Sequence, residues 1–141
     1  MNLGGDCSKV QAKLVHVQSI YGNNWAFAAL KADGSVVAWG GSGGDASKVQ
    51  HQLVDVRHIY STGGNYGGAF AALKADGTVV AWGDEDYGGD CSNVQEQLVD
   101  VRSIYSTEYA FAALKADGSI VTWGHPRYLE DVRQKAAAHK N

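Results

Sequence analysis

The stretch Ala110-Phe-Ala-Ala-Leu-Lys-Ala-Asp-Gly-Ser-Ile-Val-Thr-Trp-Gly124 decides the fold of this chain. A small, apolar run leads to Asp117-Gly118, and a β-branched run then ends at Trp123. Asp-Gly between two such runs predicts a β-hairpin with a two-residue turn of type I′, which needs positive φ at both central positions. The same pattern occurs at residues 26–40 and 69–83, so the chain is a repeat protein.

Each hairpin is preceded by a shared opening segment, Gly-Gly-Asp-[Cys/Ala]-Ser. In all three copies a Gln follows the Ser by three positions, as in Ser92 and Gln95, which is the spacing of a capping box. This spacing predicts a short helical turn of about two windings at the start of each unit. A strand then follows, at residues 15–21, 54–60 and 99–105, and each hairpin supplies two more.

These elements predict a mainly β fold with a repeat domain over residues 1–124, made of units at about 4–40, 43–83 and 88–124. Consecutive strands joined by tight turns pair antiparallel. We therefore expect three tandem units, each of three antiparallel strands and a short helical turn. The middle unit carries four extra residues within 61–68, an insertion that we expect to be confined to a loop.

The repeat pattern ends at Gly124, and residues 125–141 are predicted to be a helical tail. Acidic residues early in this segment and Lys135 late in it suit the helix dipole, so we expect a helix from Arg127 to about His139. Terminal elements usually cap a repeat array. The helix should therefore turn one apolar side toward the third unit or a partner protein. That side comprises Leu129, Val132 and Ala136.

Three tryptophans recur with the period of the backbone, at Trp39, Trp82 and Trp123. An aromatic residue repeated in this way is usually core, so we expect each one to pack between adjacent blades. A ladder for stacking a ligand is the alternative. The turn glycines of the same hairpins are expected to be structural as well; they are Gly34, Gly77 and Gly118.

Aromatic residues outside the repeat pattern are better candidates for binding. Trp25 has Gly68 and Tyr109 at its equivalent positions, which places it on a variable loop. Loops carry binding residues more often than the elements they connect. The candidate binding residues are Trp25, Tyr66, Tyr87 and Tyr109.

The pattern Asp84-x-Asp86-x-Gly88-x-Asp90 is similar to a calcium loop. However, the twelfth position is Gln95 and not the bidentate Glu that the full loop requires. We therefore expect no metal and no cofactor, with calcium at Asp84, Asp86 and Asp90 as the alternative. The sequence also contains no nucleophile–base pattern and no phosphate loop, so we expect no enzyme activity and no small-molecule substrate.

Composition narrows the class of partner. A net charge of −3 without a basic block argues against nucleic acid, and no apolar run is long enough to span a membrane. The first residues lack the features of a secretory signal. Cys7 and Cys91 occupy equivalent positions two repeats apart, too far for a disulfide, and reduced cysteines indicate an intracellular compartment. The localisation is otherwise unknown.

The repeated motif Ala-Leu-Lys-x-Asp-Gly-x-Val-x-x-Trp-Gly resembles the regulator of chromosome condensation repeat over residues 4–124. It is most similar to the short, three-stranded version found in the propeller-type β-lactamase inhibitor protein. The resemblance implies that the three units are propeller-like blades. Blades of this family form rings of seven, so three of them should form an open, partial propeller. The resemblance also implies a role as a protein-binding platform, a guanine-nucleotide exchange factor or an inhibitor.

Three units fill only part of such a ring, and closure is what removes exposed blade faces. We therefore expect the flank around Leu3, Val10 and Leu14 to be covered by another polypeptide. The function that follows is a non-catalytic protein–protein interaction module, an accessory or scaffold subunit docked in a larger assembly. A carbohydrate-binding lectin that uses the loop aromatics is the alternative.

Overall fold

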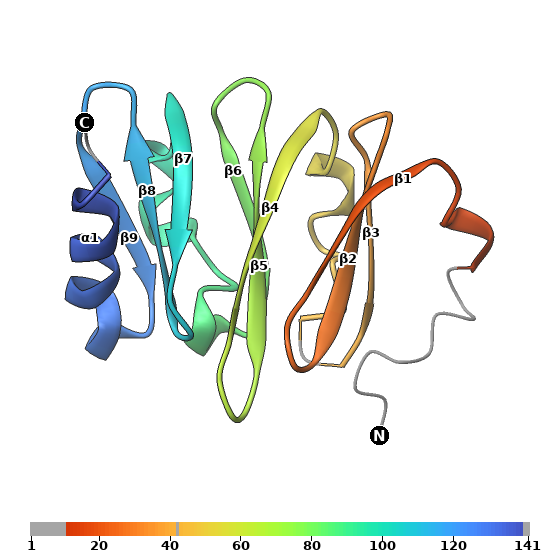
Figure 1. Ribbon diagram of the computed structural model, residues 1–141, viewed down its shortest axis with the longest axis horizontal. Helices are drawn as coiled ribbons and strands as arrows, with labels where there is room; N and C mark the ends of the chain where they lie inside the picture. The colour runs from red at the N-terminus through yellow and green to blue at the C-terminus, as the bar shows by residue number, and fades with distance from the viewer. Residues whose placement is uncertain (1–10, 42, 140–141) are drawn as a thin grey trace.

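The computed structural model describes residues 11–41 and 43–139. The strands in these ranges form three separate antiparallel sheets of three strands each. The first sheet holds β1 (Val17–Gly22), β2 (Ala26–Lys31) and β3 (Val36–Gly40); the second holds β4 (Val56–Gly63), β5 (Gly68–Lys74) and β6 (Val79–Gly83). The third holds β7 (Val101–Ser106), β8 (Ala110–Lys115) and β9 (Ile120–Gly124). The sheets stand side by side as blades of an open array, which confirms the predicted fold class (Figure 1).

The short helices that open the units are 3-10 helices. They are η1 (Gln11–Lys13), η2 (Gln50–Gln52) and η4 (Ser92–Gln97). The predicted capping box is wrong in the second and third units, and Ser8 of the first unit lies outside the described residues. Gln95 Nε2 donates to Val79 O at 3.2 Å, so this glutamine binds the last strand of the preceding sheet. Gln50 Nε2 does the same with Val36 O at 2.9 Å. The N–H of Ser92 is instead satisfied by Asp90 Oδ1 at 2.9 Å.

The hairpin turns are not of type I′. Gly77 has φ of 85°, but among the described non-glycine residues positive φ occurs only at His16, Asp55 and Asp100, so Asp76 has negative φ. Gly77 N–H donates to Lys74 O, and Lys74 N–H donates to Thr78 O, both at 3.0 Å. This is a type I turn followed by a left-handed glycine, in a three-residue loop. Gly34 and Gly118 have φ of 86° and 88° in the same position.

The first strand of each sheet begins two residues later than predicted. Val54 is 50% exposed, and Asp55 is left-handed with φ of 55°. The Asp55 carbonyl accepts from Ala75 N at 2.8 Å within its own sheet, while Val56 N donates to Gly34 O of the previous sheet at 2.9 Å. The left-handed residue thus directs consecutive backbone groups to two neighbouring hairpins, which a continuous strand does not do.

The insertion in the middle unit lengthens both strands as well as the loop, whereas the sequence predicted an insertion confined to the loop. β4 runs for eight residues to Gly63, and β5 starts at Gly68. Gly64 N–H donates to Gly67 O at 2.9 Å and closes the tip of this longer hairpin. In Figure 1 the connection between β4 and β5 extends below the other two sheets.

The core lies between the sheets. One apolar cluster joins the first and second sheets, and another joins the second and third. Trp82 stacks on Phe70 with ring centroids 5.4 Å apart, and Trp123 stacks on Phe111 at 5.3 Å. Trp82 and Trp123 are only 3% and 4% exposed. Trp39 is half-buried, because no described sheet covers that side of the first sheet.

The C-terminal helix covers the far side of the third sheet (Figure 1). A 3-10 turn, η5 (Pro126–Tyr128), comes first, so α1 runs over Leu129–Ala137, shorter than the predicted helix. Val132 and Ala136 are fully buried, in a cluster with Ala110 and Ala112 of β8, and Leu129 packs beside them. This side of α1 therefore faces the third sheet. No described helix is long and apolar enough to cross a membrane.

Candidate interaction surfaces

The outer face of the first sheet is apolar, and no described element covers it. Ile20 in β1 is 59% exposed, whereas its counterparts Ile59 and Ile104 are each 3% exposed. Each counterpart lies in the cluster formed with the preceding sheet. The exposure of Ile20 therefore marks a surface that the repeat architecture normally covers.

Neighbouring side chains extend this open face. Phe27 and Trp39 stack at 5.5 Å but remain half-buried, while Phe70 and Phe111 at the equivalent position are fully buried. Leu14 is also half-buried. The other two residues of the predicted flank, Leu3 and Val10, lie outside the described residues.

Backbone hydrogen bonds show the same difference between the first sheet and the other two sheets. Val56 N and Val101 N each donate to the turn glycine of the preceding sheet, at 2.9 Å. Val17 occupies the same position in the first sheet and makes no bond of this kind to a described residue. At the opposite end, α1 is fastened over the third sheet, where Lys135 Nζ donates to Ser106 O at 2.6 Å. Because α1 occupies that face, a second copy cannot stack there as a further sheet.

Three of the four predicted loop aromatics meet in one place. Tyr87 stacks on Tyr109 at 5.6 Å, and Tyr66 N–H donates to the Tyr87 hydroxyl at 3.3 Å. Tyr109 also stacks on Tyr128 at 4.3 Å. They line a cavity of about 350 Å³ together with Asn65, Asp84, Asp86, His125 and Arg127.

Exposure differs sharply within this aromatic group. Tyr66 is 85% exposed, whereas Tyr87 is 7% exposed and is largely structural. Trp25 is apart from the cavity, and its Nε1 donates to Gly64 O at 3.0 Å, which ties the first sheet to the long hairpin. His125 and Tyr128 were missed as candidates. They follow the last repeat, and no local pattern links them to loops of the second unit.

The acidic residues of the calcium-like pattern are engaged in turns. Asp84 Oδ1 accepts from Asp86 N at 2.9 Å and caps η3 (Glu85–Tyr87). Asp90 Oδ1 likewise accepts a hydrogen bond from Ser92 N. Within residues 11–41 and 43–139, no three His, Cys, Asp or Glu side chains lie close enough to hold a metal ion. The geometry of these residues thus does not support the alternative that they bind calcium.

Cys91 is a buried free thiol, and its burial raises the pKa of the thiol. Its Sγ donates to Gln95 Oε1 at 3.3 Å, and the residue lies in the apolar cluster that joins the second and third sheets. Cys7 lies outside the described residues.

Solved structures similar to this one include RCC1 proteins. Yeast RCC1 (Prp20) bound to Kap60 is 22% identical with a TM-score of 0.51, over 77% of this chain and 29% of that one. Prp20p from Saccharomyces cerevisiae, described with its binding to Gsp1p and histones, is 22% identical with a TM-score of 0.50, over 77% and 30%. Human WBSCR16 is 20% identical with a TM-score of 0.49, over 77% and 33%.

The chain therefore shares the blade fold of RCC1 proteins, in agreement with the resemblance of its sequence motif. At these identities the likeness concerns the fold. The chain spans about a third of the length of these solved structures. No protein-family model matches it, and no curated protein matches it.

Proposed function

We propose that this chain is a non-catalytic protein-interaction module that docks, as an accessory or scaffold subunit, through the open face of its first sheet. The observation that carries this proposal is the exposure of Ile20, 59% against 3% at both equivalent positions. Large exposed apolar patches mark interaction sites in soluble proteins. The solved Prp20 structures are described with protein partners, namely Kap60, Gsp1p and histones, which supports a protein as the kind of partner.

Substitution on this face tests the proposal. The chain has a mass of 15.0 kDa, and we expect it to elute from its source extract in a larger assembly. Ile20→Asp should release it as a free chain, because a buried, unpaired carboxylate opposes docking. Val54→Asp is the matched control, since Val54 is also half exposed, at 50%, but lies away from this face. A free wild-type chain, or equal assembly of both variants, would contradict the proposal.

Carbohydrate binding is the second candidate, favoured by the convergence of Tyr66, Tyr87 and Tyr109 on one cavity. Exposed aromatic rings can stack on the apolar faces of sugars, and Tyr66 is exposed enough to do so. A glycan array tests it. Tyr66→Ala should abolish binding and Tyr66→Phe should keep it, whereas an array without signal for the wild-type chain removes this candidate.

A further inference from the structure

Each contact between neighbouring sheets pairs small side chains with large ones. The earlier sheet supplies mainly alanines, and the later sheet supplies an isoleucine, a phenylalanine and a tryptophan. Between the second and third sheets these residues are Ala69, Ala71 and Ala81 against Ile104, Phe111 and Trp123. Between the first and second sheets they are Ala26, Ala28 and Ala38 against Ile59, Phe70 and Trp82. Each sheet thus has a small-residue face and a large-residue face.

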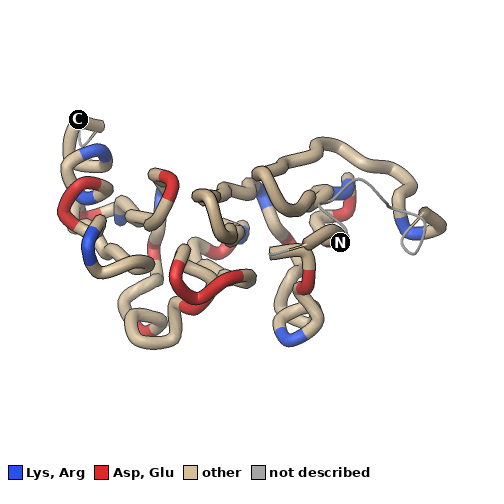
Figure 2. The backbone as a smooth tube through the Cα atoms, turned by 90° about the horizontal axis from the view of Figure 1, so that it is seen from below, with Lys and Arg blue, Asp and Glu red and all other residues tan. Residues whose placement is uncertain are grey.

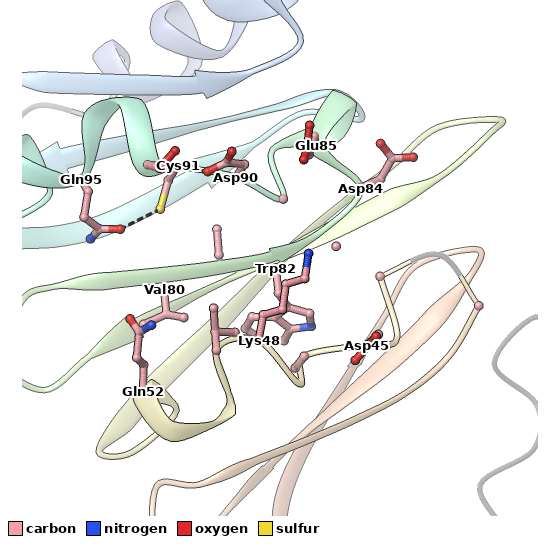
Figure 3. Close-up of a pocket in the computed structure, with 18 residues that line it drawn as sticks. Asp45, Lys48, Gln52, Val80, Trp82, Asp84, Glu85, Asp90, Cys91 and Gln95 are labelled. Atoms are coloured by element: carbon pink, nitrogen blue, oxygen red, sulfur yellow. Dashed lines mark hydrogen bonds between the residues drawn. The ribbon is translucent and has the colours of Figure 1, made fainter.

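The two faces of one sheet carry alternate residues of its strands, because side chains alternate between faces along a strand. Figure 3 shows Val80 and Trp82 on one side of β6, beside the segment that enters the second unit. Cys91, in the segment that enters the third unit, lies on the other side of β6 (Figure 3). The middle sheet uses both faces for its neighbours, so each outer sheet of the described array has one face that no other sheet covers.

The faces left by the two outer sheets are of opposite kinds. On the third sheet it is the small-residue face, and α1 packs on it. On the first sheet it is the large-residue face, the open face that carries Ile20, Phe27 and Trp39. Lys31 is the only charged residue in the three strands of the first sheet, and Figure 2 shows no charged residue along β1. Charge is depleted at the cores of protein interfaces, so this composition suits a partner with an apolar face.

The backbone of the first sheet has the conformation of a sheet that already receives a neighbour. Asp55 is left-handed, and a Cβ added to the turn glycine of the preceding sheet, Gly34, would lie 3.0 Å from Asp55 Cα. Asp100 has the same relation to Gly77, at 3.2 Å. His16 is left-handed as well, with φ of 56°, although no sheet precedes it among the described residues. This conformation costs free energy in a residue other than glycine, so it marks a position shaped for a contact.

We propose that the open face binds a further blade of the same kind, carried by another polypeptide. This inference rests on the proposed docking through the first sheet, and it specifies the partner. The docked blade presents a small-residue face to Ile20 and its neighbours, and the glycine of its Asp-Gly turn lies against His16. Val17 N then donates to the carbonyl of that glycine, as the equivalent valines of the second and third sheets do within the chain.

A second copy of this chain does not supply such a blade. Its open face carries the same large side chains, which lack the small partners that both observed interfaces contain. Its small-residue face at the other end lies under α1, where Val132 and Ala136 pack on Ala110 and Ala112. The partner therefore has a blade whose small-residue face is free of a capping helix.

Photo-cross-linking of the full chain in its source extract tests the proposal. Ile20→p-benzoylphenylalanine keeps the face apolar and attaches to whatever side chain lies against it. We expect the attached peptide to come from a strand with the pattern Ala-x-Ala-x-Leu before an Asp-Gly turn, or from the strand after that turn. The same replacement at Val54 is the matched control, because Val54 is also half exposed, at 50%, but lies away from the open face.

The outcomes separate this inference from the proposed function. A cross-linked peptide that lies outside such a blade, or within residues 17–39 of a second copy, overturns the inference and leaves docking through this face intact. No cross-linked product at position 20 overturns both. Equal yields of the blade peptide from positions 20 and 54 also overturn both, since docking then does not distinguish the open face.

Amide exchange at Val17 gives an independent measurement. Val17 N has no bond to a turn glycine among the described residues, so its amide should exchange faster in the free chain than those of Val56 and Val101. In the purified assembly, exchange at Val17 should slow about tenfold or more, because the docked turn accepts this N–H. Equal exchange at Val17 in the free chain and in the assembly overturns the inference.

Discussion

The turn glycine of each hairpin meets two demands at once. Gly77 has φ of 85°, and a Cβ added there would lie 3.2 Å from Asp100 Cα of the next sheet. Its carbonyl also accepts from Val101 N at 2.9 Å. Glycine is required by the backbone conformation and by the close approach of the neighbouring sheet together.

Gly77→Val should therefore destabilise the protein by more than about 1 kcal/mol, because a β-branched residue adopts positive φ at high cost. Gly118→Val is the informative comparison. Gly118 has φ of 88°, but no further described sheet packs against its turn, so Gly118→Val should reduce the free energy of unfolding by less than Gly77→Val. Urea unfolding measures both, and equal losses would show that the contact with the next sheet adds nothing.

The aspartate beside each turn glycine is held by the residue two positions later. Asp76 Oδ1 accepts from Thr78 Oγ1 at 2.6 Å and from Thr78 N at 3.0 Å, and these bonds lower the pKa of the Asp76 carboxyl. The pKa values of Asp33 and Asp117 are lowered in the same way by Ser35 and Ser119. Ionised aspartates thus favour the folded turn.

Because the pKa values of these aspartates are lowered in the folded state, the stability of the protein falls at acid pH. The unfolded pKa of aspartate is about 3.9, so the contribution is complete above about pH 5 and is lost as pH falls through the lower folded pKa. Asp76→Asn should reduce the loss of stability between pH 7 and pH 3, and Thr78→Val should reduce it in part. Thermal unfolding at the two pH values measures this, and an unchanged pH dependence in both variants would contradict it.

At the scale of elements, α1 takes the place that a fourth sheet would occupy. Val132 and Ala136 are fully buried against Ala110 and Ala112 of the third sheet. The second sheet uses the equivalent face to contact the third sheet. Arg133 Nη1 adds a hydrogen bond to Ile120 O at 3.3 Å. The helix is therefore a cap that ends the array on this side.

Deleting residues 126–141 should expose this face and cause self-association, which light scattering measures. Val132→Asp should reproduce the effect by placing a carboxylate in the same buried site. Gln134→Asp, at an exposed position of the same helix, should not. A truncated chain that stays monomeric and equally stable would make the helix dispensable.

The repeat motif was sufficient to predict the strands and sheets, and the charge and apolar pattern after Gly124 predicted the capping helix, because each depends on local patterns. Three details depended on interactions that the local pattern does not show, and two of these are competitions between side chains. Asp-Gly suits two kinds of turn, and the Ser or Thr two residues after the Asp favours the three-residue loop. In the opening segment Asp90 takes the Ser92 N–H, which leaves Gln95 free to reach Val79.

The third detail concerns the first strand of each sheet. Val54-Asp55-Val56 has the alternation of a strand, but the contact with the preceding hairpin forces Asp55 into the left-handed region. The candidate sites also depend on contacts between units. Tyr66, Tyr87 and Tyr109 were predicted one by one, while their convergence with Tyr128 depends on how the units pack.

At the scale of the whole molecule, the two ends of the array are unequal. The third sheet lies between the second sheet and α1, while the first sheet has one described neighbour. An apolar face such as that of Ile20 persists on only one end of the described array. The array therefore has a closed end and an open end.

The hydrogen bonds from Val56 to Gly34 and from Val101 to Gly77 join each sheet to the one before it, so they influence the order in which the sheets unfold locally. In a repeat array, stability is approximately the sum of each unit and its nearest-neighbour contacts, so units open in order of how many neighbours they have. Amide hydrogens of β1–β3 should exchange with deuterium first, and those of β5 and β8 last. Mass spectrometry of exchanged peptides measures this order, and uniform exchange would show that the chain opens as one cooperative unit. A partner seated on the first sheet should slow exchange there most, so the protein becomes uniformly protected only when bound.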